Sequence, residues 1–376
     1  MALKISILGT RGIPAKYGGF ETYAEEISKN LIKIGHRVTV YNPHYNSVEN
    51  ESYNGVDIKY VYSLETWLPG KILKAVSTII YDALSLLKAS FSDSDIIILC
   101  GYASGPFMLI PKIFKKKLVL NPDGFEWNSS RWGTLSKKWL YFCEKISSLV
   151  PDHLIADSDV IRQHFIDKYN CTPTTITYGA ELISFSEKSK IVDSNKDYFL
   201  IIARVVPETS IPLMVEGFII SKSKKNLYIV GPIKDNDFFQ KEVKPLIDTH
   251  TNIFFLGPIY TDGEVTKLRY NAIALLHGHA SEGTNPSLLE SMAVGSFILS
   301  IKRQSNVNIL SKEFDVFFEN SHELSEKIIW LENLNDFEFS KIKEHNFNTA
   351  KKNFSWIKKA YEHEKVFMKV LKKENK

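Results

Sequence analysis

The feature that most constrains the fold is a repeated alternation of short Ile-, Val- and Leu-rich runs with longer segments of helical periodicity. Apolar runs without polar alternation are typical of parallel strands that helices cover on both faces. The predicted strands fall into two series. The first covers 5–9, 37–41, 57–62, 95–100, 117–121, 153–157 and 175–179, and the second covers 198–203, 226–231, 252–257, 272–278 and 297–301.

A polar stretch without apolar periodicity separates the two series, and we interpret residues 184–197 as a linker. A chain of 376 residues also exceeds the usual size of one domain. We therefore predict an α/β protein with two doubly wound, Rossmann-like domains, 1–183 and 198–350, that face a cleft. The remaining segment, 351–376, is predicted to hold a helix over 355–373 that can return to the first domain, although periodicity does not decide this.

Composition argues against several classes of protein. Hydrophobic residues make up 44% and charged residues 24%, which is ordinary for a globular chain, and a net charge of +4 is too small to indicate nucleic acid. The three cysteines are widely spaced and form no CxxC pair, so a cytoplasmic location is expected. The chain opens on the strand-like KISILGT without a signal-peptide pattern, and the most apolar window, 96–110, is too broken to span a bilayer.

Ligands of doubly wound sheets bind where the strands end, so the residues that follow each strand are candidates. Gly18 and Gly19 lie in a turn before a helix that matches neither a dinucleotide nor a phosphate-loop pattern, and a plain turn explains them equally. Asp123 lies in a Pro-Asp-Gly segment that is either an ordinary turn or a carboxylate in the cleft. Arg204 can clamp a diphosphate or form a surface ion pair.

The most informative stretch reads HGHASEGTNPSLLESMA and follows a predicted strand. A helix is predicted to begin at Pro286 with Asn285 as its cap, which leaves the amides of 283–287 available to a diphosphate. Glu282 and Glu290 flank this turn, where their carboxylates can accept hydrogen bonds from hydroxyl groups. Hydroxyls on both sides of a diphosphate describe a nucleotide sugar. The alternative, two solvated glutamates, fits the strand–turn–helix context less well.

These residues resemble the retaining glycosyltransferases of family 4, which have the two-domain GT-B fold. The run EGTNPSLLE resembles their E-x7-E motif, and Arg204 stands at the Arg of their phosphate-binding R-x4-K, with Thr209 in place of the Lys. Over nearly the whole chain, the resemblance is to bacterial rhamnosyltransferases that build capsular and cell-wall polysaccharides. It is carried by ILGTRGIPAKYGGFET, NPDGFEW, HLIADS, YGAE, IFFLGPIY and HGH…GTNPSLLE.

The resemblance implies a role for each candidate residue. Glu290 is expected to bind ribose or deoxyribose hydroxyls, and Glu282 is expected to face the transferred sugar. Asp123 is a candidate by position only, because many family members have a His in that region. His277 or His279 can assist as a cation beside the diphosphate, although packing is the favoured role. Six residues are expected around the donor diphosphate: Gly18, Gly19, Arg204, Gly283, Thr284 and Asn285.

The implied activity is transfer of L-rhamnose from dTDP-β-L-rhamnose to a lipid-linked saccharide at the cytoplasmic face of the membrane. Two alternatives are a family 4 transferase that uses a UDP- or GDP-sugar and a non-catalytic protein that binds sugar nucleotides. A lipid-linked acceptor predicts peripheral membrane contact. The amphipathic segment 67–91 and the basic segment 111–117 fit that contact, although a core helix with a solvated lysine face explains 67–91 as well.

Two acidic triplets, 93–95 and 157–159, have the D-x-D pattern by which transferases of another fold hold a divalent metal ion. The first precedes a strand, at the end away from the cleft, and the second lies at a strand–helix junction where capping accounts for it. We therefore expect neither triplet to bind metal, and we predict transfer without a metal cofactor.

Overall fold

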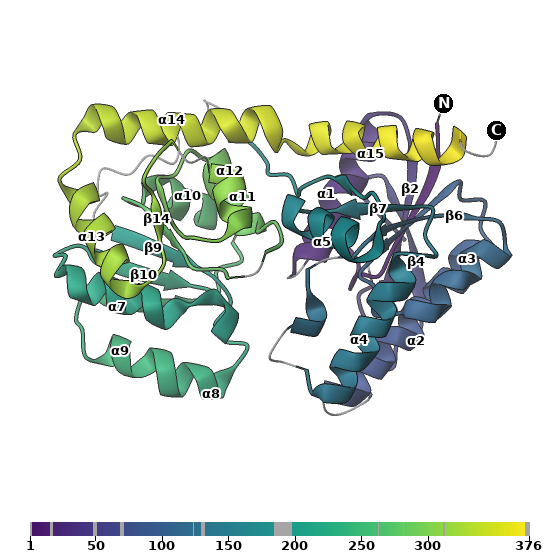
Figure 1. Ribbon diagram of the computed structural model, residues 1–376, viewed down its shortest axis with the longest axis horizontal. Coiled ribbons are helices and arrows are strands. Elements are labelled where there is room, and N and C mark those ends of the chain that lie inside the picture. The colour runs from purple at the N-terminus through teal and green to yellow at the C-terminus, as the bar shows by residue number, and fades with distance from the viewer. Residues whose placement is uncertain are drawn as a thin grey trace. The chain divides into compact units, whose positions relative to one another are not determined.

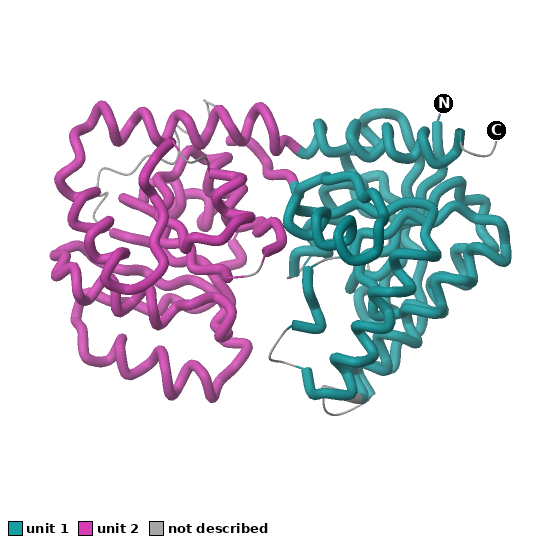
Figure 2. The backbone as a smooth tube through the Cα atoms, viewed as in Figure 1, with its two compact units in different colours: residues 1–178, 356–376 teal, residues 179–355 magenta. Residues whose placement is uncertain are grey.

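The computed structural model describes residues 2–15, 18–47, 51–67, 71–122, 124–128, 132–183, 198–261, 263–280, 282–310 and 313–372. The chain divides into two compact units, which Figure 2 distinguishes by colour. The first consists of Met1–Tyr178 and Trp356–Lys376, and the second consists of Gly179–Ser355. The predicted linker at 184–197 and the candidate Asp123 lie outside the described residues.

The first unit is built on a sheet with the strand order β3-β4-β2-β1-β5-β6-β7-β8, in which only β3 and β4 pair antiparallel within the described residues (Figure 1). Its strands are β1 (Lys4–Leu8), β2 (Arg37–Pro43), β3 (Ser52–Tyr53), β4 (Val56–Val61), β5 (Ile96–Cys100), β6 (Lys117–Asn121), β7 (His153–Ala156) and β8 (Thr174–Thr175). Its helical segments are α1 (Gly19–Lys33), α2 (Lys71–Ser90), η1 (Gly105–Met108), α3 (Leu109–Ile113), η2 (Glu126–Asn128), α4 (Thr134–Ser147), α5 (Asp159–Tyr169) and α15 (Trp356–Lys372).

The second unit contains a parallel sheet with the order β11-β10-β9-β12-β13-β14. Its strands are β9 (Tyr198–Ile202), β10 (Asn226–Val230), β11 (Ile253–Gly257), β12 (Leu275–His277), β13 (Ile298–Ile301) and β14 (Phe317–Phe318). Its helical segments are η3 (Pro207–Thr209), α7 (Ile211–Ser221), α8 (Asn236–Phe238), η4 (Phe239–Val243), α9 (Lys244–Asp248), α10 (Glu264–Asn271), α11 (Pro286–Ala293), α12 (Gln304–Leu310), α13 (Ser321–Glu332) and α14 (Asp336–Asn353).

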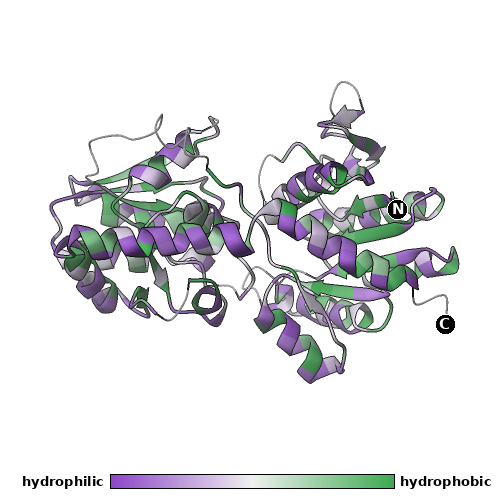
Figure 3. Ribbon diagram, turned by 90° about the horizontal axis from the view of Figure 1, so that it is seen from above, coloured by the Kyte–Doolittle hydropathy of each residue, from purple (hydrophilic) through white to green (hydrophobic). Residues whose placement is uncertain are grey.

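Burial explains why the apolar runs form strands. All residues of β5 are buried, and so are all those of β7 and β13, because helices pack on both faces of each sheet. Figure 3 shows this pattern as green strands beside α14, whose residues are mostly hydrophilic. The predicted α/β class with two Rossmann-like parallel sheets is therefore confirmed.

The C-terminal helix belongs to the first unit. α14 ends in the second unit, and α15 packs on α1 (Figure 1). The contact centres on Tyr23, whose hydroxyl lies 2.7 Å from Nε2 of the buried His363. The Tyr23 ring also packs against Trp356 and Tyr178. The return to the first domain that the sequence allowed is thus observed.

The short strands are where the structure differs from the sequence prediction. β3 and β14 have two residues each and were not predicted, because two residues carry no periodicity. A signal for β3 did exist, since Asn54 and Gly55 both have positive φ and form the tight turn that Asn-Gly favours. β8 covers only Thr174–Thr175 instead of 175–179, and Tyr178 packs on Tyr23 instead. β12 begins at Leu275, not 272, because Ala272 still caps α10.

Candidate functional site

The order of the second sheet reverses between β9 and β12, which are hydrogen-bonded neighbours. In doubly wound sheets this reversal opens a crevice at the carboxyl ends of the two strands. Arg204 follows β9, and the run 278–285 follows β12, so both lie at this edge. The amide of Ala280 donates a hydrogen bond to the carbonyl oxygen of Glu208 (3.0 Å), which joins the two loops. The structure therefore brings together the second-domain candidates that the sequence singled out.

Arg204 is exposed and, in the part of the chain that the structure describes, has no ion pair. Thr209 occupies the position of the family's lysine and is buried. Its hydroxyl donates to the carbonyl oxygens of Arg204 (2.9 Å) and Val206 (2.8 Å), so it shapes the turn and adds no charge. Gly278 packs on this turn so closely that a Cβ there would lie 2.6 Å from the Thr209 carbonyl oxygen, which requires glycine.

The turn before α11 is capped as the sequence predicted. Pro286 begins the helix, and Oδ1 of Asn285 accepts hydrogen bonds from the amides of Ser287 (2.9 Å) and Leu288 (3.4 Å). The prediction that all amides of 283–287 are available to a phosphate is therefore wrong for Ser287, because its amide already donates to the Asn285 cap. Pro286 has no N–H and cannot contribute either.

Glu290 lies one turn into α11 and is held by a residue that the sequence reasoning missed. Nη2 of Arg269, on α10, lies 2.5 Å from Oε2 of Glu290 and 3.3 Å from the Ser287 hydroxyl. The arginine side chain is only 9% exposed, whereas that of Glu290 is 37% exposed. Arg269 therefore fixes one carboxylate oxygen of Glu290 from behind, and the exposed part of the carboxylate can accept a hydrogen bond from a ligand.

Glu282 lies at the start of the same turn, and its Oε2 accepts a hydrogen bond from the amide of Ser305 (3.3 Å). Ser305 belongs to the first turn of α12, which follows β13. A carboxylate at a helix N-terminus is stabilised by the helix dipole. The two glutamates of the motif thus have different surroundings: Glu282 faces helix amides, and Glu290 faces a guanidinium.

His277 is the last residue of β12 and His279 lies in the loop that follows, with ring centroids 6.5 Å apart. Burial, with a smaller effect of His279, lowers the pKa of His277 to about 3. Burial and the nearby charge of Arg204 lower the pKa of His279 to about 4, against the opposing effect of Glu208. Both rings are therefore neutral at pH 7 in the ligand-free chain, which favours packing or hydrogen bonding over the cationic role considered from the sequence. Nε2 of the buried His277 has no hydrogen-bond partner among the described residues.

Gly18 and Gly19 belong to the first unit, where they start α1. Gly18 has φ +105°, and a Cβ there would lie 2.1 Å from the Glu21 carboxylate. Oε1 of Glu21 accepts a hydrogen bond from the amide of Arg11 (2.7 Å). The first turn of α1 therefore presents a carboxylate as well as its amides, and glycine is required so that this carboxylate can fold back on the loop.

Comparison with known families gives the second unit an identity. Residues 184–354 match the family of Glycosyl transferases group 1. The second unit is a group 1 glycosyl transferase domain. Residues 2–181 match a domain of unknown function, DUF1972. No curated protein sequence matches the chain.

Solved structures of GT-B glycosyltransferases share the fold. A glycosyltransferase from Rickettsia africae is 17% identical, with a TM-score of 0.70 over 99% of both chains. Sucrose-phosphate synthase from Thermosynechococcus elongatus is 12% identical, with a TM-score of 0.77 over 98% of this chain and 99% of that one. Anabaena Alr3699/HepE, solved with UDP and glucose, is 14% identical, with a TM-score of 0.71 over 98% of this chain and all of the other. At these identities the likeness shows the fold alone.

The DUF1972 unit contains a second feature that the sequence reasoning missed. The carboxylate of Glu144 is buried and lies within hydrogen-bond distance of Trp127 Nε1 (2.5 Å), His164 Nε2 (3.0 Å), Lys168 Nζ (2.7 Å) and the Tyr169 hydroxyl (2.7 Å). Burial alone would raise the pKa of Glu144, but these donors outweigh it and lower the pKa. The network fixes the indole of Trp127 in one orientation.

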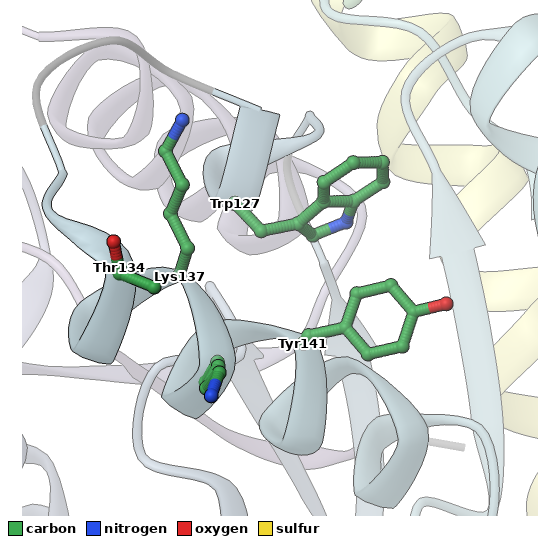
Figure 4. A pocket seen from close by; sticks show the side chains of 5 residues that line it. Trp127, Thr134, Lys137 and Tyr141 are labelled. Atoms are coloured by element: carbon green, nitrogen blue, oxygen red, sulfur yellow. The ribbon is translucent and has the colours of Figure 1, made fainter.

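Trp127 and Tyr141 line a pocket of about 360 Å³ together with Thr134, Lys137 and Lys138 (Figure 4). The two rings are 5.7 Å apart with an interplanar angle of 75°. Aromatic faces bind the C–H faces of sugars, and lysines bind phosphates. Trp127 follows β6, at the carboxyl edge of the first sheet where this fold binds ligands.

Residues of both D-x-D triplets make structural contacts. Asp93 pairs with Lys4 (2.5 Å), ahead of β5. Ser158 caps α5 by accepting from the Ile161 amide, and Asp159 accepts from the Thr175 hydroxyl (2.7 Å). Within the described residues, no group of three or more His, Cys, Asp or Glu side chains is arranged to hold a metal ion. No helix in that part of the chain is long and apolar enough to cross a membrane.

Proposed function

We propose that this chain is a retaining glycosyltransferase that transfers L-rhamnose from dTDP-β-L-rhamnose to a lipid-linked saccharide during synthesis of a capsule or another cell-surface polysaccharide. The observation that carries the proposal is the meeting of the β9 and β12 loops at the reversal point of the second sheet. Arg204, the turn at 283–285 and Glu290 lie at that edge, in a group 1 glycosyl transferase domain.

The diphosphate leaving group needs positive charge, because the bond from the sugar C1 to the phosphate oxygen breaks with its electron pair on that oxygen. Arg204 supplies one charge, and the amides of 283–285 supply hydrogen-bond donors at a helix N-terminus. Thr209 cannot replace the lysine of the R-x4-K pattern. We assign that part to Lys234, which follows β10 and whose amide donates to the carbonyl oxygen of Val205 (3.4 Å), beside Arg204.

Glu290 is proposed to accept hydrogen bonds from the ribose or deoxyribose hydroxyls while Arg269 holds its other oxygen. Glu282 is proposed to face the transferred sugar, where a carboxylate stabilises the positive charge that develops at C1. Retention requires the acceptor hydroxyl to bond to C1 on the face that the diphosphate leaves, and its proton passes to the departing phosphate oxygen. A dTDP-β-L-rhamnose donor then gives a β-L-rhamnoside.

Rhamnose is chosen because motifs across the chain resemble those of bacterial rhamnosyltransferases. A second candidate is a UDP-sugar, because Anabaena Alr3699/HepE, which shares the fold, has been solved with UDP-glucose. The two candidates use the same loops and differ only in the groups that contact the base and the sugar. For the acceptor, we assign the pocket of Trp127 and Tyr141, where a saccharide can stack and Lys137 and Lys138 can meet a lipid diphosphate.

A donor screen tests the proposal. The purified chain is incubated with dTDP-β-L-rhamnose, UDP-glucose and GDP-mannose, with and without a lipid extract, and the released nucleoside diphosphate is measured. We expect release from dTDP-β-L-rhamnose above all, faster with extract, and much slower release by Glu282→Ala. Release from a UDP-sugar instead would support the second candidate, and binding without release from any donor would indicate a non-catalytic protein.

A further inference from the structure

α2 exposes more large apolar side chains than a helix on a globular domain normally does. Its buried side combines Tyr81, Leu86 and Ala89 with four polar residues, Ser77, Asp82, Ser85 and Ser90, and each of the seven is less than 5% exposed. The hydroxyls of Ser85 and Ser90 donate to carbonyl oxygens one turn earlier. Apart from Tyr81 and Leu86, the large apolar side chains that the structure describes for this helix are not buried.

The exposed large apolar residues lie on the outer side of α2. The spacing of three and four residues puts them on one stripe, which spans about 27 Å along the helix at 1.5 Å per residue. Each is between 38% and 70% exposed. The stripe, which we call the α2 stripe, consists of Leu73, Val76, Ile80, Leu84, Leu87 and Phe91.

A neighbouring helix extends this surface. α3 packs beside α2 (Figure 1), and the rings of Phe91 and Phe114 lie 4.5 Å apart. Leu109 and Ile113 of α3 are 49% and 75% exposed. Soluble monomers rarely expose a continuous apolar patch of this size unless it binds a membrane or another protein.

The charge of this surface favours a membrane over a second protein. Residues 71–90 and 109–117 contain seven lysines, and their only acid, Asp82, is buried. Asp152 lies against Lys112 and Lys117 and offsets one of these charges, whereas Asp93 pairs with Lys4, so the lysines of the two segments remain in excess. Against a second copy of the chain, the lysine rims would meet each other across a two-fold axis and repel. Against an anionic bilayer, the apolar stripe enters the interface and the lysines meet the headgroups.

We propose that the α2 stripe, with α3 and the surrounding lysines, docks the chain on an anionic lipid bilayer. The inference deepens the proposed function, because it brings the enzyme to the surface that carries a lipid-linked acceptor. Its test does not depend on sugar transfer, since docking is measured without donor or acceptor.

The experiment is co-sedimentation of the full chain with vesicles of phosphatidylcholine alone and with added phosphatidylglycerol. We expect binding only to the anionic vesicles and weaker binding at high salt. The double variant Ile80→Glu/Leu84→Glu is expected to lower the partition coefficient roughly ten-fold or more, because it places two charges in the apolar stripe. Phe337→Glu, a matched change at a 78% exposed residue of the second unit, is expected to leave it unchanged.

Lysine variants test the charge separately. Lys74→Glu/Lys88→Glu is expected to lower anionic binding roughly ten-fold or more, whereas Lys224→Glu/Lys241→Glu in the second unit is expected to change it little. Circular dichroism and dTDP binding show whether each variant is folded. Equal binding to both vesicle types, or none, overturns the proposal. So does a wild-type dimer in sedimentation velocity that Ile80→Glu/Leu84→Glu converts to a monomer, because the stripe would then be a self-interface.

Discussion

Arg269→Met is expected to weaken nucleotide binding only through its effect on Glu290. The guanidinium and carboxylate are 2.5 Å apart, and a charge-assisted hydrogen bond of this kind contributes about 1.5–3 kcal/mol when both partners are buried. Glu290 is 37% exposed, so solvent screening reduces the figure to about 1 kcal/mol, or roughly a five-fold rise in Kd. Methionine is chosen because it fills the buried space of the arginine stem.

The assay is calorimetric titration of dTDP into four chains: wild type, Arg269→Met, Glu290→Ala and the double variant. Glu290→Ala is expected to raise Kd more than Arg269→Met, because it removes the group that we propose contacts the nucleoside. In the Glu290→Ala background, Arg269→Met is expected to change nothing further. Equal losses in both backgrounds would refute the reasoning, and so would unchanged binding in Arg269→Met. Arg162→Met, in the first unit, controls for the loss of an arginine.

Three further outcomes are expected. Glu282→Ala should reduce the rate of transfer much more than dTDP affinity, as measured by kcat beside calorimetric Kd; equal effects on both would place Glu282 on the nucleotide. Transfer should continue in excess EDTA, and Arg204→Ala should impair it severely without rescue by Mg²⁺; restoration of EDTA-treated enzyme by Mg²⁺ or Mn²⁺ would contradict this. Burial lowers the pKa of His363 to about 4, so the folded state binds this proton less readily than the unfolded state, and stability should fall by up to about 3 kcal/mol as pH drops from 6.5 to 4. Urea unfolding at several pH values checks this, and His363→Phe should remove that part of the slope.

The sequence alone predicted those elements that are determined by residues close together in the chain. Long apolar runs predicted the strands of both sheets, and the order Asn285-Pro286 predicted the cap and first residue of α11, because capping depends on neighbours in sequence. The two-residue strands β3 and β14 fall below the length at which periodicity can be seen.

The contacts that hold the candidate site residues in place could be found only in the tertiary structure. Arg269 precedes Glu290 by 21 residues, and the two meet only because α10 packs beside α11. Glu144 gathers donors from two other segments, η2 and α5, which no spacing in the sequence reveals. For α2, the amphipathic pattern was visible in the sequence, but the pattern alone does not tell which side faces the core. Burial shows that the side with Ser77 and Asp82 does.

Hydrogen–deuterium exchange of the full chain with and without dTDP tests the central claim, that the donor nucleotide binds at the carboxyl ends of β9 and β12. The method reads individual backbone amides and needs neither an acceptor nor turnover. We expect dTDP to slow exchange at 203–209 and 278–290, and we expect Glu290→Ala to abolish this protection at the same dTDP concentration. Protection confined to the first unit, or protection at 278–290 that is unchanged in Glu290→Ala, would contradict it.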